Sequence, residues 1–294
     1  MVSATQTRSQ SRAWLGSALA LAAAAGYALA NTSATLAYAG GSNALTVAGT
    51  RFLVPTIALV IWLRLDGAPL VLPGRDGLIA ASLGVVTAFY TWALLNSLNA
   101  IPLAVAVLIF YLFPLIAAAI VAIFGWDKFS WKTGAGLLLA LCGVALALDI
   151  QSGQIGAIGV ILAFLAACGL AVVIAVSGRL FARSDARPLT LYMAVVAAIV
   201  LLVLCAASGD FALPQTNSGW IGFFAAAIAY GFAMIAFFFA LSIIGPVRAS
   251  LLSYAEAVIS AWLGVAVLGQ ALTLTQLAGI ALVIIALVAT TLAR

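Results

Sequence analysis

The residue of this sequence with the clearest capacity for chemistry is Glu256, the only glutamate, which stands inside an uncharged and strongly apolar segment. Ser253 and Ser260 lie three residues before it and four residues after it, so on one helix the three side chains form a polar stripe. A charged carboxylate at the centre of a bilayer costs about 2.5 to 3.5 kcal/mol, so we expect Glu256 to be protonated, hydrogen-bonded or in contact with water. It could bind a substrate amine or exchange a proton; alternatively, it bonds to a neighbouring helix.

Aromatic and amide side chains on other apolar segments are further candidates for binding. Tyr254 lies about 200° around the helix from Glu256, so the two cannot both point squarely into one cavity. Packing in the core or at the membrane interface is the alternative for each aromatic ring, and bonding between helices is the alternative for each amide. The candidate binding residues are Tyr27, Tyr90, Trp92, Asn96, Phe110, Tyr111, Phe113, Tyr230, Phe237 and Tyr254.

Pro114 is a candidate hinge in the same region. Proline has no N–H and its ring clashes one turn back, so it leaves the Phe110 carbonyl unpaired or kinks the helix. The weak point could serve as a hinge or present a carbonyl to a ligand. Packing alone is the alternative, because membrane helices tolerate proline.

Several classes of protein are excluded by residues that are missing. The sequence has no histidine, which is the usual metal ligand and the usual base at neutral pH. The three cysteines, Cys142, Cys168 and Cys205, lack the paired spacing of a metal site. The apolar segments contain one acid and no lysine, so they cannot supply a nucleophile with its base or a pair of carboxylates. We therefore expect that the protein is not an enzyme. Without a GxxxxGK[ST] motif the chain hydrolyses no ATP, and we expect no cofactor.

Composition places the chain in a membrane. Apolar residues make up 66% of the sequence and charged residues 6%, with a mean hydropathy of +1.29, whereas about a quarter of a soluble domain is charged. Breaks at glycine, proline and charge clusters predict ten spans of about 20 residues. They cover Trp14 to Tyr38, Ala44 to Leu63, Leu78 to Leu98, Pro102 to Gly125, Thr133 to Leu148, Gly156 to Ser177, Leu189 to Ser208, Gly219 to Ile243, Val247 to Leu268, and Leu274 to Leu292.

The basic residues predict the orientation of these spans. Lysine and arginine gather on the cytoplasmic side, so alternate loops should differ in charge. Arg51 falls inside the second span, where we expect its long side chain to snorkel to the surface. Nucleic acid is not an expected partner, because the bases form no cluster interleaved with aromatics. All other bases fall on the side of the two termini, which we therefore place in the cytoplasm: Arg8, Arg12, Arg64, Arg75, Lys128, Lys132, Arg179, Arg183, Arg187, Arg248 and Arg294.

The sequence also matches itself when it is shifted along its own length. One fixed shift, called the repeat offset below, aligns Gly16 with Gly159, Gly26 with Gly169, Tyr111 with Tyr254 and Gly136 with Gly279. We therefore expect two repeats, at residues 1–149 and 150–294. Because each repeat has five spans, the second must be inverted in the membrane, and inverted repeats of transporters bind substrate near mid-membrane where they meet.

The repeat also predicts the character of the site. The repeat offset places Phe110, Phe113 and Ala117 where the second half has Ser253, Glu256 and Ser260. One wall of the site would then be aromatic, and the facing wall would be polar with a single acid. Such a site suits an amphipathic solute with an amine and an apolar side chain.

Two segments, Ile109 to Leu148 and Leu251 to Leu292, resemble the EamA repeat of the drug/metabolite transporter superfamily. Pro114 matches a proline of that repeat, and Glu256 matches the acid of its Glu-Pro pair, although Ala257 replaces the second proline. Gly125-Trp126-Asp127 and Gly269-Gln270 replace its Gly-Glu pairs. The resemblance implies an all-α membrane protein, with ten transmembrane helices arranged as two inverted five-helix repeats.

Within that superfamily the chain is similar to the YddG-type exporters of amino acids. The similarity implies a secondary transporter of the bacterial inner membrane that exports aromatic and other neutral amino acids by alternating access, by facilitated diffusion or with proton coupling. An exporter of drugs, toxic cations or other small metabolites is the alternative, because an acid among aromatic rings also suits a cation. The expected partners are a small-molecule substrate and the lipid bilayer, and we expect a monomer or weak dimer. The inverted repeat disfavours a channel.

Overall fold

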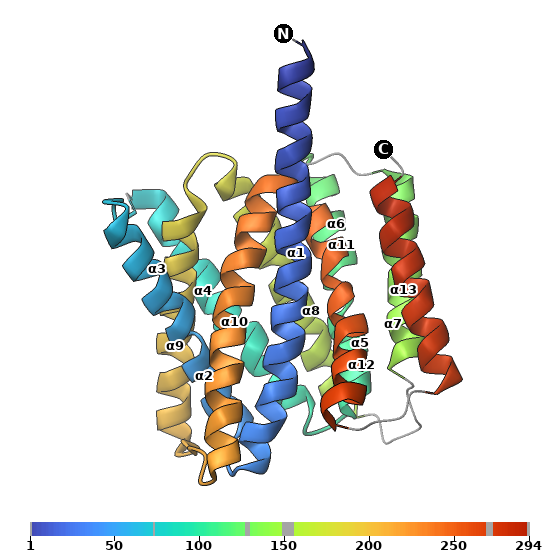
Figure 1. The fold of residues 1–294 in the computed structure, drawn as a ribbon. Coiled ribbons are helices and arrows are strands. Elements are labelled where there is room, and N and C mark those ends of the chain that lie inside the picture. The colour runs from blue at the N-terminus through green and yellow to red at the C-terminus, as the bar shows by residue number, and fades with distance from the viewer. Residues whose placement is uncertain (1, 73, 127–129, 149–155, 269–272, 293–294) are drawn as a thin grey trace.

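The computed structural model describes residues 2–72, 74–126, 130–148, 156–268 and 273–292, and within these ranges the chain forms helices and no strand (Figure 1). The helices are α1 (Val2–Ala39), α2 (Ala44–Arg51), α3 (Leu53–Leu65), α4 (Gly74–Ser97), α5 (Leu103–Phe110), α6 (Phe113–Ile123), α7 (Trp131–Ala147), α8 (Ala157–Phe181), α9 (Ala186–Ser208), α10 (Asn217–Ile244), α11 (Pro246–Ser253), α12 (Ala255–Leu268) and α13 (Leu274–Leu292).

Ten transmembrane segments are built from these helices, as the sequence predicts. Three segments consist of two helices separated by a short break: α2 with α3, α5 with α6, and α11 with α12. Eight segments are long and apolar enough to cross a membrane, and α7 and α13 are shorter apolar helices. The chain is thus a multi-pass membrane protein, and its two termini lie on the same side (Figure 1).

Polar side chains cap the N-termini of several of these helices, where each accepts a hydrogen bond from a free backbone N–H of the first turn. Asn43 accepts from the Thr46 N–H at 2.8 Å at the start of α2, and Thr216 accepts from the Gly219 N–H at 3.1 Å at the start of α10. At the other end of a helix, Gly209 ends α9 with a φ of 70°, a left-handed conformation that glycine adopts without strain.

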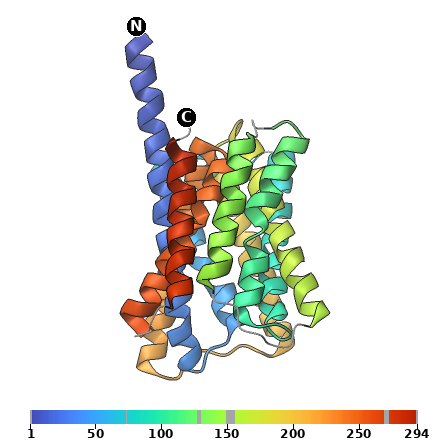
Figure 2. The ribbon, with the colours of Figure 1, turned by 90° about the vertical axis from the view of Figure 1, so that its right-hand side faces the viewer.

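The packing of the helices repeats when the two halves are exchanged, which confirms the inverted repeat. α1 packs along α10, and its counterpart α8 packs along α4. The fifth segment of each half packs against the other, so that α7 and α13 lie side by side (Figures 1 and 2). The predicted boundary between residues 149 and 150 lies outside the described residues.

Two glycines show the repeat at the level of single residues. A Cβ on Gly26 would lie 2.9 Å from the Cβ of Ala233, and a Cβ on Gly169 would lie 2.8 Å from the Cβ of Tyr90. The repeat offset relates one pair to the other, once between α1 and α10 and once between α8 and α4. Small residues are required here because the helices approach more closely than a larger side chain permits.

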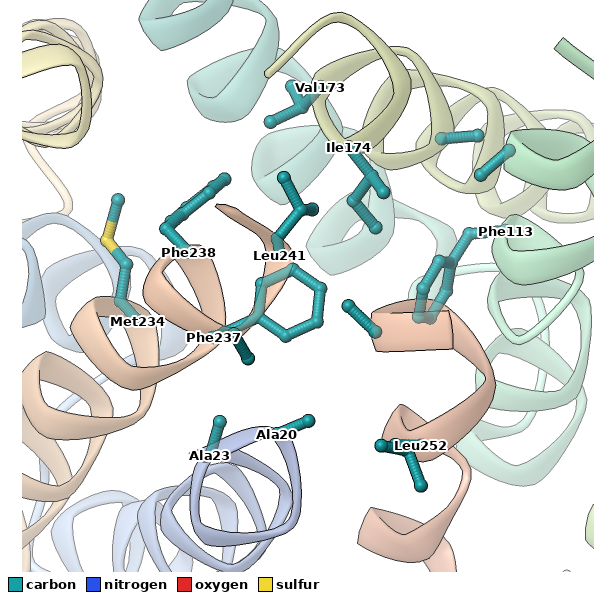
Figure 3. Packing of buried hydrophobic residues seen from close by; sticks show 14 of the residues in the cluster. Ala20, Ala23, Phe113, Val173, Ile174, Met234, Phe237, Phe238, Leu241 and Leu252 are labelled. Carbon is teal, nitrogen blue, oxygen red and sulfur yellow. The ribbon is translucent and has the colours of Figure 1, made fainter. Parts of the chain in front are cut away.

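The interior of the bundle is filled with buried apolar side chains from several helices. Figure 3 shows Phe237 and Leu241 of α10 facing Ile174 of α8, with Phe113 and Leu252 close by. All five side chains are buried.

Ion pairs link the two halves on the side of the termini. Arg183 forms a salt bridge of 2.9 Å with Asp76, whose other carboxylate oxygen accepts a hydrogen bond from Ser184 at 2.6 Å. Arg187 pairs with Asp185 at 2.7 Å and also with Asp66. Since Asp66 and Asp76 belong to the first half, these contacts hold the halves together on this side.

Candidate functional site

The two helix breaks at Tyr111 and Tyr254 meet at the junction between the repeats. α5 ends at Phe110 and α11 ends at Ser253, two positions that the repeat offset aligns. The rings of Tyr111 and Tyr254 are stacked, with centroids 5.8 Å apart and an interplanar angle of 30°. The Tyr254 hydroxyl donates a hydrogen bond to the Tyr111 carbonyl at 2.9 Å. The sequence match between these tyrosines therefore corresponds to a direct contact.

The first break has a local cause. Pro114 lies in the first turn of α6 and has no N–H, so it cannot donate to the Phe110 carbonyl one turn back. Instead, the Leu112 N–H bonds to the Ile109 carbonyl three residues back, at 3.1 Å, which tightens the turn. The use of Pro114 as a hinge stays a prediction.

The second break occurs without a proline, because Ala257 stands at the equivalent position. Its turn is tightened in the same way: the Tyr254 N–H bonds to the Leu251 carbonyl and the Ala257 N–H bonds to the Tyr254 carbonyl, both at 3.2 Å. Since the sequence has no local helix breaker here, packing between the repeats accounts for the break better than local sequence does.

We predict a measurable loss of stability for Tyr254→Phe. The substitution keeps the stacked ring but removes the donor to a buried carbonyl, which costs about 1 kcal/mol. The melting temperature of the purified protein should fall by about 2–4 °C. Tyr38→Phe, on a side chain that is 41% exposed, is the matched control and should leave the melting temperature unchanged. Equal melting temperatures for Tyr254→Phe and wild type would contradict the stabilising role of this bond.

Glu256 lies directly after the second break, in the first turn of α12. The free N–H groups of a helix start favour a negative charge at this position. Its Oε1 atom accepts a hydrogen bond from the Asn31 side chain of α1 at 2.9 Å, and the Tyr111 hydroxyl is a second hydrogen-bonding neighbour. Glu256 is partly exposed and Asn31 is exposed. The carboxylate therefore connects both repeats while it stays accessible, and the interhelical bond considered from the sequence is present.

The predicted polar stripe is interrupted by the helix break. Ser253 ends α11, is buried, and donates its hydroxyl to the Ala249 carbonyl at 3.1 Å. Ser260 lies on α12 with Glu256 and is partly exposed. The expected spacing assumed one continuous helix, so only Ser260 keeps its predicted relation to the acid.

Most of the predicted aromatic residues form a connected cluster beside Glu256. Tyr230 of α10 packs edge-on against Tyr27 of α1, with ring centroids 5.5 Å apart, and Tyr27 lies 6.4 Å from Phe237. Tyr90 of α4 interacts through its hydroxyl with Tyr230. A row of rings continues from Tyr90 to Phe110, at 6.2 Å, and from Phe110 to Phe113, at 5.6 Å.

Two predicted binding residues on α4, Trp92 and Asn96, make contacts outside this aromatic cluster. The Trp92 ring packs against Phe89, with centroids 6.2 Å apart, and Phe89 is exposed. The Asn96 side chain donates to the backbone carbonyl of Trp92 at 2.9 Å, which satisfies one of its donors within its own helix. Their assignment to a substrate site stays a prediction.

Arg51 is the charged residue whose placement the sequence did not predict. We expected its side chain to snorkel to the surface, but its guanidinium carbon lies 4.0 Å from the ring centroid of the buried Tyr230 and 5.7 Å from that of Phe52. Its position within an apolar span was a signal for function, because membrane proteins seldom carry charges there without a purpose. Sequence could not choose between the two directions for so long a side chain.

Among the residues that the structure describes, the site therefore contains one acid, Glu256, and one base, Arg51. Glu256 and Arg51 interact electrostatically, but they do not form a salt bridge, because no carboxylate oxygen of Glu256 lies within 4.0 Å of a guanidinium nitrogen of Arg51. Tyrosine rings lie close to both groups. The arrangement can contact a positive charge, a negative charge and an apolar group of one small molecule.

An apolar groove of about 550 Å³ lies elsewhere, between α1 and α10. It holds none of the predicted site residues, and its wholly apolar lining suits contact with lipid. Its lining residues are Ala22, Ala25, Gly26, Leu29, Ala225, Ile228, Ala229 and Phe232.

Comparison with known proteins agrees with this architecture. The model of the EamA-like transporter family matches residues 14–148 and again residues 157–292, once for each repeat. A solved crystal structure of a protein superposes with a TM-score of 0.81 over 97% of each chain; at 21% sequence identity, this likeness concerns the fold. Among curated proteins, none matches this sequence.

Proposed function

Since this chain belongs to the EamA-like transporter family, a family of membrane transporters, we propose that it is a secondary carrier that exports amino acids. Its substrates are aromatic and other neutral amino acids, moved by alternating access through the junction of the two repeats. The carrier lies in a bacterial inner membrane with both termini in the cytoplasm and acts as a monomer or weak dimer. The concentration of bases on the side of the termini supports this orientation.

The accessible Glu256 carboxylate beside the tyrosine cluster is the observation that carries the proposal. A carboxylate attracts the ammonium group of an amino acid, and the rings of Tyr27 and Tyr230 offer apolar faces to its side chain. Because Asn31 belongs to the first repeat and Glu256 to the second, a substrate bound here would bridge the parts that move in alternating access.

The distribution of exposure supports an opening on the side away from the termini. Along α1, Tyr27 is partly exposed, whereas Asn31 and Thr35, which lie farther from the N-terminus, are exposed. Phe237 and Leu241, which lie nearer the end of α10 at Ile244, are buried among other apolar side chains (Figure 3). With cytoplasmic termini, this arrangement is the outward-facing state of the proposed carrier.

Transport by the purified chain in proteoliposomes tests the proposal. Radiolabelled phenylalanine and threonine are compared with a quaternary ammonium dye, with and without a pH gradient. We expect saturable phenylalanine flux, and a gradient that changes its rate would indicate proton coupling. Amino-acid flux equal to that of empty liposomes would contradict the proposal, and flux of the dye alone would favour the drug or cation exporter.

A further inference from the structure

Arg51 carries a charge for which the described residues provide no counter-ion in direct contact. No carboxylate of the described residues lies within 4.0 Å of its nitrogen atoms, and its Nε atom is buried without a hydrogen-bond partner among them. A buried donor without a partner costs about 1–3 kcal/mol, and more when the group is charged. A ligand that supplies acceptor atoms would remove this cost.

Contacts within the fold explain only part of the placement of Arg51. The C-terminus of α2, where Arg51 is the last residue, favours a positive charge, and the Tyr230 ring face attracts the guanidinium at 4.0 Å. The Tyr230 hydroxyl is also a hydrogen-bonding neighbour of the Arg51 side chain, but the Nε atom of Arg51 is still left without a partner among the described residues. The guanidinium plane, with its parallel N–H groups, matches the two oxygens of a carboxylate.

Glu256 lies near Arg51 but leaves it free for another anion. The two side chains interact electrostatically, yet the carboxylate already accepts from Asn31 at 2.9 Å and no direct ion pair forms. Opposite charges are thus held apart across the tyrosine cluster. A zwitterion can satisfy both at once, with its ammonium group towards Glu256 and its carboxylate towards Arg51.

We infer that Arg51 and Tyr230 form a carboxylate-binding subsite, and that the protein therefore selects zwitterionic amino acids over amines and quaternary cations. The inference rests on the proposed function, because it assigns the specificity of the same site. A substrate with only a positive charge would place that charge near Arg51 and be repelled. The selection arises at Arg51, which has no charged counterpart in the other half, since the repeat offset places Ala194 there.

Three ligands that share a phenyl ring distinguish the contribution of the ammonium group from that of the carboxylate. L-phenylalanine carries both groups, phenethylamine carries only the ammonium group, and 3-phenylpropanoate carries only the carboxylate. Their affinities for the full chain in detergent are measured by calorimetric titration. Arg51→Gln is the test variant, and Arg64→Gln is the control, because Arg64 lies in the same transmembrane segment but is exposed near the side of the termini.

In wild type, phenylalanine should bind more tightly than either singly charged ligand. Arg51→Gln should weaken the binding of phenylalanine and 3-phenylpropanoate about tenfold to a hundredfold, as expected for a lost charged hydrogen bond. It should tighten the binding of phenethylamine, because the charge that repels the ammonium group is removed. Arg64→Gln should change none of the three affinities. If Arg51→Gln does not elute as a folded species, Arg51→Lys replaces it, since lysine keeps the charge but loses the bidentate geometry.

The inference is overturned if a folded Arg51 variant binds 3-phenylpropanoate as wild type does, or loses phenethylamine equally. It is also overturned if wild type binds none of the three ligands. Failure of the proposed function has a different signature. In that case, wild type binds carboxylates through Arg51 but moves no phenylalanine across proteoliposomes.

Discussion

Glu256→Gln is expected to lower phenylalanine transport by about a hundredfold while the protein stays folded. The amide is nearly isosteric with the carboxyl group, and its oxygen can still accept the bond from Asn31. What it loses is the negative charge that attracts the substrate ammonium group. A hydrogen bond to a charged group contributes about 1.5–3 kcal/mol, so the upper end corresponds to about a hundredfold. Initial rates of net phenylalanine transport in proteoliposomes, with and without a pH gradient, measure the effect.

Asp210→Asn is the matched control for this variant. It makes the same change of acid to amide on an exposed residue after α9, on the side away from the termini. We expect wild-type transport and wild-type elution from a sizing column. If folded Glu256→Gln protein transports phenylalanine at the wild-type rate, Glu256 has neither of the charge-dependent roles assigned to it, whether amine binding or proton exchange.

Gly279→Leu is expected to abolish the folded protein. Gly279 of α13 is buried against α7, where an added Cβ would lie 2.6 Å from the Gly143 carbonyl oxygen and 2.8 Å from the Leu146 carbonyl carbon. It would also overlap the backbone nitrogen of Ala147. These are backbone atoms, so no rotamer change relieves the overlap, and α7 and α13 must separate. Overpacking typically costs about 1–3 kcal/mol and occasionally more, and we expect an overlap with fixed backbone atoms to lie at or above the upper end of this range.

The yield of monodisperse protein after purification measures this loss. Ala278→Leu is the control, because Ala278 precedes Gly279 on the same helix but is exposed. It should give wild-type yield and melting temperature. A folded Gly279→Leu protein with wild-type melting temperature would show that the two helices do not need this close approach.

The fold could be predicted from sequence because its strongest signals are local or repeated. The lengths of the apolar stretches defined the ten segments, and the placement of the basic residues predicted their orientation in the membrane. The glycine matches at the repeat offset proved more informative than aliphatic matches. Gly26 and Gly169 occupy equivalent close contacts, and the residues that they face are related by the same offset. The close helix contacts require a small residue at both positions, and this requirement is visible in the sequence as matching glycines.

The site was predicted less completely because its geometry depends on contacts between distant segments. Pro114 indicated the break near Tyr111, but nothing local indicated the break at Tyr254, where Ala257 replaces a proline. That break ends the helix of Ser253 before Glu256. The direction of the Arg51 side chain likewise depends on the Tyr230 ring, which belongs to the other half of the chain.

The role of Glu256 in binding is tested most directly by the equilibrium binding of radiolabelled phenylalanine to purified wild-type and Glu256→Gln protein, measured in parallel. We expect saturable binding at one site in wild type and an affinity at least about tenfold weaker in the variant, as for a lost charged contact. Equal affinities in two folded proteins would contradict this role, because the amino acid would then bind without the carboxylate at the junction of the repeats.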